Sequence, residues 1–170
     1  DDIEFKYDAM GNRVLKLAKP RTGSGVKTQE FWTYTYYIRD AAGNVLSVYE
    51  RTLPKTGGTY KDKLVLDENH LYGSKRAGIK TPNLLTAEKN YNFTSYNGDG
   101  TMNGSLTSTT SITVSGTAFT HTLGEKSYEL ANHLGNVLAT VSDKRIPTNS
   151  SGTITAYTAV VNSAQDYYSF

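Results

Sequence analysis

The segment 95–106 contains residue types that could bind calcium. It is rich in Asn, Asp and Gly, and it places side-chain oxygens at alternate positions with Gly100 in the sixth, as in calcium loops of the Asp-x-Asn-x-Asp-Gly type. The first position, however, is Ser95, and the twelfth, where a bidentate Glu or Asp is needed, is Leu106. The single carboxylate of Asp99 does not offset the dehydration of a divalent ion. We therefore predict a plain Gly/Asn-rich loop, with a calcium site as the alternative.

Other residue types that carry catalysis do not fall into catalytic patterns. The histidines, His70, His121 and His133, are far apart and lack the spacing of a metal-binding pair. No Ser lies in a Gly-x-Ser-x-Gly motif, and the Gly-Ser-Gly segment 23–25 lacks the following Lys of a phosphate-binding loop. The chain has no Cys, which excludes disulfides, thiolate zinc sites and a Cys nucleophile. The sequence thus predicts no enzyme activity, no cofactor, and no catalytic, cofactor-binding or metal-binding residues.

The aromatic run Phe31–Arg39 could bind a ligand or build a core. On a strand, Trp32, Tyr34 and Tyr36 point to one face, and exposed rings on one face could stack against a sugar. The competing interpretation is that these rings pack inside the protein. Aliphatic residues are scarce, with a hydrophobic content of 37%, so the aromatic rings are needed as core material. We favour packing and keep a glycan contact at these three residues as the alternative.

A turn motif recurs three times along the chain. Its pattern is Asp or Asn, two variable residues, Gly, Asn, one variable residue and an apolar residue. Its copies contain Asp8, Gly11 and Asn12; Asp40, Gly43 and Asn44; and Asn132, Gly135 and Asn136. The first side chain can accept hydrogen bonds from backbone N–H groups further along the turn, and the Gly can take a positive φ. Each copy therefore predicts a hairpin closed by a type I turn with a Gly bulge.

The strands around these turns define three repeats, near 3–17, 31–51 and 127–142. Apolar and polar residues alternate on both sides of each turn, which is typical of half-buried strands. Such hairpins cannot bury an apolar face alone, so the copies are expected to join one continuing sheet. The interval between the second and third copies is much longer than between the first two. We therefore expect a divergent or inserted segment near 79–122.

The remaining segments give weaker signals. The pattern predicts strands at 61–66, 111–122 and 153–161, an irregular segment at 67–78, and a polar connector at 144–152. The only helical leaning in the chain lies between Thr86 and Thr94.

Composition supports an all-β protein without a nucleic-acid partner. Tyr (13 residues) and Thr suit strands, and 15 Gly separate them. The net charge of +2 comes from Lys and Arg spread evenly along the chain, whereas nucleic-acid binding requires a clustered basic face. No apolar run approaches the length of a membrane span. Both ends of the chain read as cut from a longer protein, so we expect the remainder of that chain to be a partner.

The motifs together resemble the RHS/YD-repeat proteins, in particular the RHS repeat-associated core region found in Bacteroidetes. The segments that carry the resemblance are Phe5–Arg13, Tyr37–Leu46, His70–Ser74, Tyr128–Lys144 and Ser163–Phe170. The resemblance implies a strand spiral forming a hollow shell, which commonly encloses a C-terminal toxin or displays a variable C-terminal module at the cell surface. Three departures are present. The second and third turn copies have Arg39 and Ala131 where the first has Tyr7, so the strict Tyr-Asp form occurs only once. Ser169 stands where the family usually has Pro, and the core-terminal segment with the self-cleaving aspartates of some members is absent. No protease residues are carried over.

We therefore expect a structural, non-catalytic segment of a secreted or cell-surface bacterial protein. Its role would be to encapsulate or present a C-terminal module, and its partners would be the rest of its own chain and secretion machinery. The first alternative is a carbohydrate-binding or adhesive surface that uses the exposed aromatic residues. A further alternative is a part of a self-processing shell.

Overall fold

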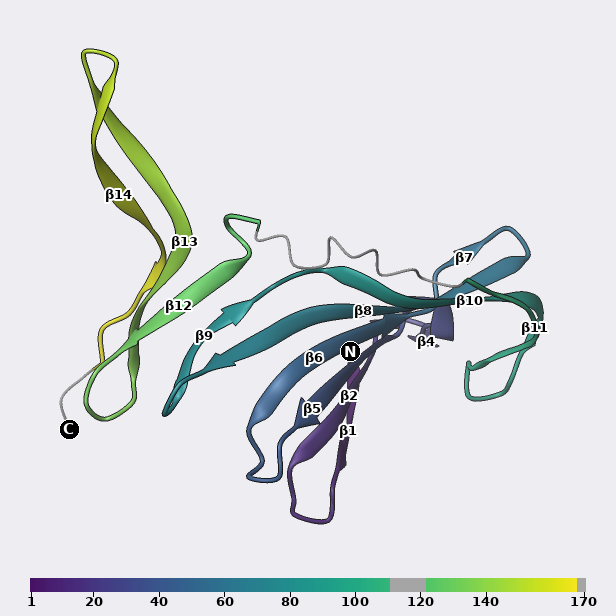
Figure 1. Cartoon of the computed structure of the whole chain (residues 1–170). Coiled ribbons are helices and arrows are strands. Elements are labelled where there is room, and N and C mark those ends of the chain that lie inside the picture. Colours follow the sequence, from purple (N-terminus) through teal and green to yellow (C-terminus); the bar gives the residue numbers. More distant parts are fainter. Residues whose placement is uncertain (111–121, 168–170) are drawn as a thin grey trace. The chain divides into compact units, whose positions relative to one another are not determined.

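The computed structural model describes residues 1–110 and 122–167 (Figure 1). The described chain is all-β and contains a large antiparallel sheet, as predicted; its one helical element is a single 3-10 turn. The strand expected at 111–122 lies outside the described residues apart from its last position. The chain divides into two compact units, unit 1 (residues 1–68 and 83–115) and unit 2 (residues 69–82 and 116–170).

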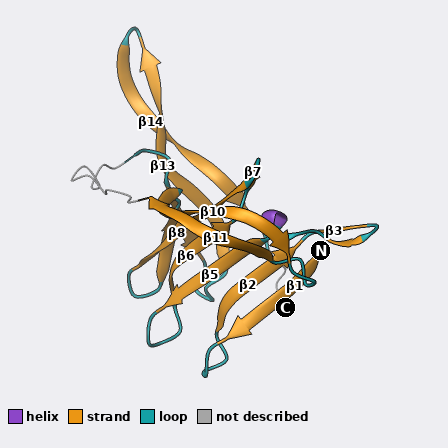
Figure 2. Ribbon diagram, turned by 90° about the vertical axis from the view of Figure 1, so that its right-hand side faces the viewer, coloured by secondary structure: helices purple, strands orange, loops and turns teal. Residues whose placement is uncertain are grey.

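Unit 1 is a sheet of strands in the order β1-β2-β5-β6-β8-β10-β11. Its elements are β1 (Asp2–Tyr7), β2 (Arg13–Lys19), β3 (Arg21–Thr22), β4 (Gly25–Val26), the 3-10 turn η1 (Gln29–Phe31), β5 (Thr33–Arg39), β6 (Val45–Thr52), β7 (Lys55–Thr56), most of β8 (Thr59–Tyr72), β10 (Leu84–Tyr96) and β11 (Met102–Thr110). β7 pairs with the start of β8, and β3 and β4 form a separate hairpin (Figure 2). Neighbours in the chain are mostly neighbours in the sheet, so local turns determine much of the topology.

The core of unit 1 is small and mostly aromatic. Its buried residues are Leu17, Trp32, Tyr34, Leu53 and Tyr60, and Phe93, Tyr96 and Met102 pack against them. The Tyr60 and Tyr96 rings meet edge to face with centroids 6.5 Å apart, and the Tyr96 and Phe93 centroids are 4.8 Å apart. The quadrupoles of aromatic rings favour such edge-to-face and tilted arrangements. The predicted use of aromatic side chains as core material therefore describes this unit well.

Two lysines extend the aromatic core toward solvent. The Lys19 ammonium lies 4.5 Å from the centroid of the Trp32 ring, and the Lys55 ammonium lies 3.9 Å from that of Phe93. A cation over a ring face is attracted by the negative face of the ring, while the aliphatic stem covers apolar surface. Two exposed ends of the core are thereby covered without additional apolar residues.

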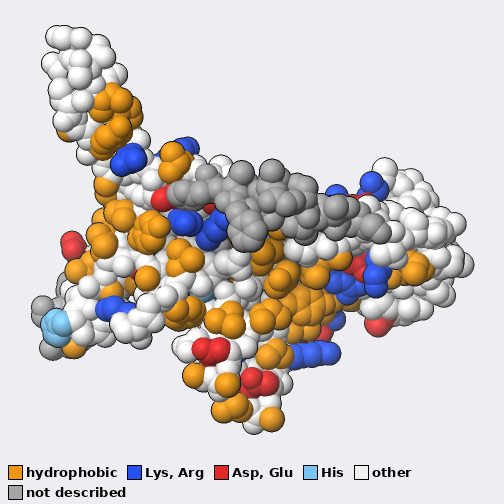
Figure 3. Space-filling model, viewed as in Figure 1, with side chains coloured by type: hydrophobic (Ala, Val, Ile, Leu, Met, Phe, Trp, Pro, Cys, Tyr) orange, Lys and Arg blue, Asp and Glu red, His pale blue; other side chains and the backbone are white. Residues whose placement is uncertain are grey.

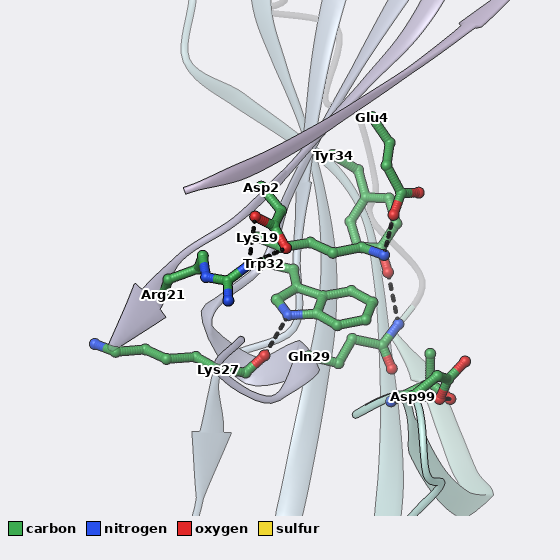
Figure 4. Close-up of polar contacts among 10 residues, drawn as sticks. Asp2, Glu4, Lys19, Arg21, Lys27, Gln29, Trp32, Tyr34 and Asp99 are labelled. Atoms are coloured by element: carbon green, nitrogen blue, oxygen red, sulfur yellow. Dashed lines mark hydrogen bonds and ion pairs between the residues drawn. The ribbon is translucent and has the colours of Figure 1, made fainter. Parts of the chain in front are cut away.

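The turn η1 connects β5 with the β10–β11 turn, which lies far along the chain. The Gln29 amide Nε2 donates to Tyr34 Oη at 2.8 Å, while its Oε1 accepts from the Met102 backbone N–H at 2.7 Å. The Gln29 backbone N–H donates to the carbonyl of Gly100 at 3.0 Å. Figure 4 shows the Gln29 side chain below the Trp32 ring and the Tyr34 hydroxyl, with Asp99 to its lower right. Because Gln29 is buried, satisfying its amide removes a desolvation cost and fixes the β10–β11 turn against β5.

Unit 2 is a sheet in the order β8-β9-β12-β13-β14, and it lacks a buried apolar core in its described part. It consists of the end of β8 with β9 (Arg76–Lys80), β12 (Lys126–Ala131), β13 (Val137–Ser150) and β14 (Thr153–Ala164). The ion pairs Arg76–Glu129 and Lys80–Glu125 span β9 and the β12 side of this sheet, at 2.6 and 3.3 Å. Many of its large apolar side chains are exposed, among them Leu130, Leu138, Ile146, Ile154, Tyr157 and Val161.

Three expectations from the sequence are wrong, and a fourth is too wide, because the Gly/Asn-rich loop predicted at 95–106 is only the turn 97–101 between β10 and β11. The helical leaning predicted at Thr86–Thr94 is not found: this segment belongs to β10, which pairs with β8 on one side and with β11 on the other. The irregular segment 67–78 is instead the end of β8, a short turn and the start of β9. The polar connector 144–152 is instead the outer half of β13 and the turn to β14, where Ser151 and Gly152 both have positive φ values, +51° and +81°.

Candidate functional site

The three predicted turns share one geometry. In the first, Asp8 Oδ1 accepts hydrogen bonds from the backbone N–H groups of Met10 (2.9 Å) and Asn12 (2.8 Å), and Gly11 has φ +82°. The same two bonds reach Asp40 from Ala42 and Asn44, and reach Asn132 from Leu134 and Asn136, with φ +88° at Gly43 and +90° at Gly135. One side-chain oxygen therefore organises each turn, and the glycine supplies the backbone angle that other residues disfavour.

Each turn also introduces a bulge into the hairpin that it closes. The backbone N–H of Asp8 donates to the Asn12 carbonyl at 2.9 Å, and the register of β1 against β2 shifts between Lys6 and Tyr7. Equivalent shifts lie between Ile38 and Arg39 in the β5–β6 hairpin, and in β12 before its turn. Bulges increase local twist and fix the register of the pair. The motif thus determines how consecutive strands are aligned.

The turns at Asp8 and Asp40 contain a carboxylate that can titrate, whereas the turn at Asn132 contains a neutral amide. The backbone hydrogen bond from Asn12 holds the pKa of Asp8 below its usual value, and the side-chain amide of Asn44 does the same for the pKa of Asp40. Both shifts arise because these bonds favour the ionised form. Asn132 makes the same backbone contacts without a titrating group.

Arg39 connects the first two turns. Its Nε donates to the Arg13 carbonyl at 3.0 Å, and its Nη1 donates to the Gly43 carbonyl at 2.6 Å. Arg39 occupies the position before the turn Asp, where the first copy has Tyr7. The sequence showed only that this Tyr is missing from the second copy, whereas the structure shows the guanidinium bridging neighbouring hairpins.

A fourth turn of related geometry lies at Asn97–Thr101, between β10 and β11. Its Asn97 N–H donates to the Thr101 carbonyl at 2.8 Å, and Gly100 has φ +82°. The repeated sequence pattern does not include it, because Thr101 stands where the other copies have Asn. An Asn-x-x-Gly pattern would have found it.

This fourth turn is also the centre of the candidate calcium loop. Asp99 Oδ1 accepts from the backbone N–H and the hydroxyl of Thr101, at 2.9 and 2.6 Å, and the hydroxyl bond holds the pKa of Asp99 below its usual value. Within residues 1–110 and 122–167, no group of three or more His, Asp or Glu side chains is arranged to hold a metal ion.

The aromatic residues singled out for glycan binding do not form one exposed surface. Trp32 and Tyr34 are only 3% and 9% exposed, so a sugar cannot stack on them in this structure. The Trp32 Nε1–H donates to the Lys27 carbonyl at 2.6 Å, and burial raises the pKa of the Tyr34 hydroxyl (Figure 4). Tyr36, the third member, is half-buried and lies further along the same face, where it lines an open groove.

The groove in unit 1 has a volume of about 770 Å³. Four strands contribute to it: Tyr36 and Ile38 from β5, Tyr49 and Arg51 from β6, Asp62 and Leu64 from β8, and Thr86, Ala87 and Lys89 from β10. On the face of unit 1 seen in Figure 3, hydrophobic side chains gather over the central strands, with charged side chains beside them. A volume of this size is in the range of small-molecule sites.

An ion pair forms one end of the groove floor. Arg51 Nε and Nη2 donate to the two carboxylate oxygens of Asp62, at 2.6 and 2.8 Å, and the guanidinium carbon lies 5.1 Å from the centroid of the Tyr34 ring. The hydrogen bond to Asp62 raises the pKa of Arg51, which keeps the guanidinium charged. The pair therefore separates the aromatic core from the open part of the same face.

Comparisons with protein-family models, with curated proteins and with solved structures find no match to this chain. In the part of the chain that the structure describes, no helix is long and apolar enough to cross a membrane.

Proposed function

We propose that this chain is a structural, non-catalytic wall segment of a secreted or cell-surface RHS/YD-repeat protein, where it encapsulates or presents a C-terminal module. The observation that carries the proposal is the turn motif, which joins adjacent antiparallel strands in the same way at Asp8, Asp40 and Asn132. Repeated use of one turn to add strands suits a protein that extends a sheet rather than one that surrounds a catalytic site.

The distribution of apolar side chains supports the same role. Few large apolar residues are buried, while many are exposed on both units, including Ile3, Phe5 and Tyr7 on the edge strand β1. Isolated soluble domains rarely leave large contiguous apolar surfaces open, and uncovered edge strands tend to pair with further chain. A sheet that contacts further strands on its edges and another polypeptide on its face would cover these residues.

The proposal is tested on a longer protein that contains this segment followed by its C-terminal module. Limited proteolysis is followed by mass spectrometry in the wild type and in a triple variant with Val at Gly11, Gly43 and Gly135. The three substitutions place a β-branched residue at positive φ and are expected to open the hairpins, so the module becomes cleavable. Gly23→Val is the control, because Gly23 has neither a positive φ nor atoms near its added Cβ. Equal cleavage of the module in the wild type and the triple variant would contradict encapsulation.

The alternative of a carbohydrate-binding surface has less support, because Trp32 and Tyr34 are buried. It would have to depend on Tyr36 and its cross-strand neighbour Tyr49 in the groove. Binding to a glycan array that is lost in Tyr49→Ala would favour it over the wall segment.

A further inference from the structure

The groove floor in unit 1 offers few unpaired polar groups. Arg51 and Asp62 bind each other through two hydrogen bonds, and the Thr86 hydroxyl donates to the Leu64 carbonyl at 2.9 Å. The Tyr36 hydroxyl also bonds to Arg51. The rest of the floor consists of the rings of Tyr36 and Tyr49, the Tyr49 hydroxyl and aliphatic side chains. The floor is therefore suited to apolar contact rather than to hydrogen bonding.

Lys89 adds one uncompensated charge to this apolar floor. It is exposed on β10 and lies directly opposite Asp62 in the β8–β10 register. The Asp62 carboxylate is occupied by Arg51, and Lys89 has no ion pair within the described residues. An ammonium group on a flexible stem thus lines a groove whose other charges cancel.

The chemistry of the groove selects among possible occupants. A sugar needs many hydrogen-bonding partners for its hydroxyl groups, whereas beside the paired side chains the groove offers only the Lys89 ammonium and the Tyr49 hydroxyl. An extended peptide would leave its backbone N–H and C=O groups without partners, because on the face of a sheet those of the strands are used in the ladder; peptides add to sheet edges instead. An apolar chain with one anionic end meets neither difficulty.

We propose that this groove binds a monocarboxylate with an apolar chain, of the size of a medium-chain fatty acid. The chain lies over Tyr36, Tyr49 and Leu64, and the carboxylate pairs with the Lys89 ammonium. This ligand role is independent of the wall function, since it depends only on the four strands that line the groove.

The test is a titration of the 170-residue chain with decanoate below its micelle concentration, followed by calorimetry and by NMR of methyl groups. Saturable shifts are expected at Ile38, Leu64 and Ala87, which line the groove. Decyltrimethylammonium has the same chain and the opposite charge, so it is expected to bind at least tenfold more weakly. Raising the salt concentration should weaken decanoate binding, because exposed charges are screened.

Two lysine variants separate the specific pairing from general attraction. Lys89→Glu is expected to weaken decanoate binding by about tenfold or more, because an attraction is replaced by a repulsion. Lys61→Glu makes the same charge change on the opposite face of β8, since Lys61 alternates with the groove residue Asp62, and should change binding by less than about twofold. Lys89→Met, which only removes the charge, should give an intermediate loss.

Several results would overturn the proposal. These are equal binding of the two decyl compounds, equal weakening by both Lys→Glu variants, and methyl shifts outside the groove. Tighter binding of acetyl-Phe-Glu amide than of decanoate would identify a peptide site. Binding to phosphatidylglycerol vesicles without binding to free decanoate would identify a membrane surface.

Discussion

Arg51 on β6 binds Asp62 on β8 through two parallel hydrogen bonds, at 2.6 and 2.8 Å, with side chains that are 29% and 12% exposed. Removing one partner leaves the other charge partly desolvated and unpaired. We predict that Asp62→Asn or Arg51→Gln lowers the free energy of unfolding by about 2 kcal/mol, between the values for exposed and buried pairs. Urea unfolding, followed by circular dichroism, measures this change.

The double variant Arg51→Met with Asp62→Leu provides the control for that prediction. Replacing both charges with apolar residues removes the desolvation cost together with the attraction, so it should be less destabilising than either single change. If the single variants unfold at the wild-type urea concentration, the ion pair contributes nothing to the stability of unit 1.

The second prediction compares two turn glycines. Gly11→Ala places a Cβ at φ +82° with no atoms within 4 Å, so it should cost about 1 kcal/mol of folding free energy from backbone strain alone. Gly43→Ala adds a contact of 3.0 Å with Asn12 Oδ1 to the same strain and should cost more. Thermal unfolding of both variants, with Gly23→Ala as the unstrained control, measures the difference. If Gly11→Ala loses as much folding free energy as Gly43→Ala, or more, the contact of the added Cβ with Asn12 in the neighbouring turn adds no cost.

The sequence predicts those parts of the fold that are determined by residues close together in the chain. The turns at Asp8, Asp40 and Asn132 follow from chemistry within five residues, so their pattern is sufficient to predict them. β10 does not follow, because the local leaning of Thr86–Thr94 is weaker than its pairing with β8 on one side and β11 on the other, and both of these strands lie outside that segment. Local signals therefore predict the hairpins better than the sheet that they join.

The groove could not be predicted for a related reason. Alternation along residues 32–36 predicts that Trp32, Tyr34 and Tyr36 share one face. It does not reveal that Tyr36 is accessible in the groove while Trp32 and Tyr34 are buried. That difference depends on η1 and on the β10–β11 turn, which Gln29 holds against the face. Likewise, Lys89 reaches the groove only because β10 shifts its register by one residue between Leu85 and Ala87.

The third prediction concerns a glycine without unusual backbone angles. A Cβ at Gly78 on β9 would lie 2.2 Å from the Ser127 carbonyl oxygen on β12, and neither backbone can move without breaking the ladder. Gly78→Ala should therefore destabilise unit 2 by about 2–3 kcal/mol, in the range of overpacked sites. Hydrogen exchange of the β9 and β12 amides reports the loss.

Gly73→Ala is the matched control for that change. Gly73 lies in the turn of the same β8–β9 hairpin, has no positive φ, and has no atoms within 4 Å of its added Cβ. Unchanged exchange in Gly78→Ala, or equal exchange in the two variants, would show that β9 and β12 do not pair in solution.

The last prediction is that acid loosens two of the three repeated turns and spares the third. The pKa values of Asp8 and Asp40 are lowered in the folded chain, so each ionised carboxylate contributes stability that is complete above the unfolded pKa of about 3.9. That contribution is lost as the pH falls below this value and through the lowered folded pKa. Asn132 makes the same backbone bonds without titrating, so its turn should not respond. Hydrogen exchange between pH 5 and pH 2, corrected for intrinsic rates, should therefore accelerate at Asn12 and Asn44 but not at Asn136. Asp8→Asn should remove the response at Asn12 only, and a uniform acceleration in all three turns would instead indicate global acid unfolding.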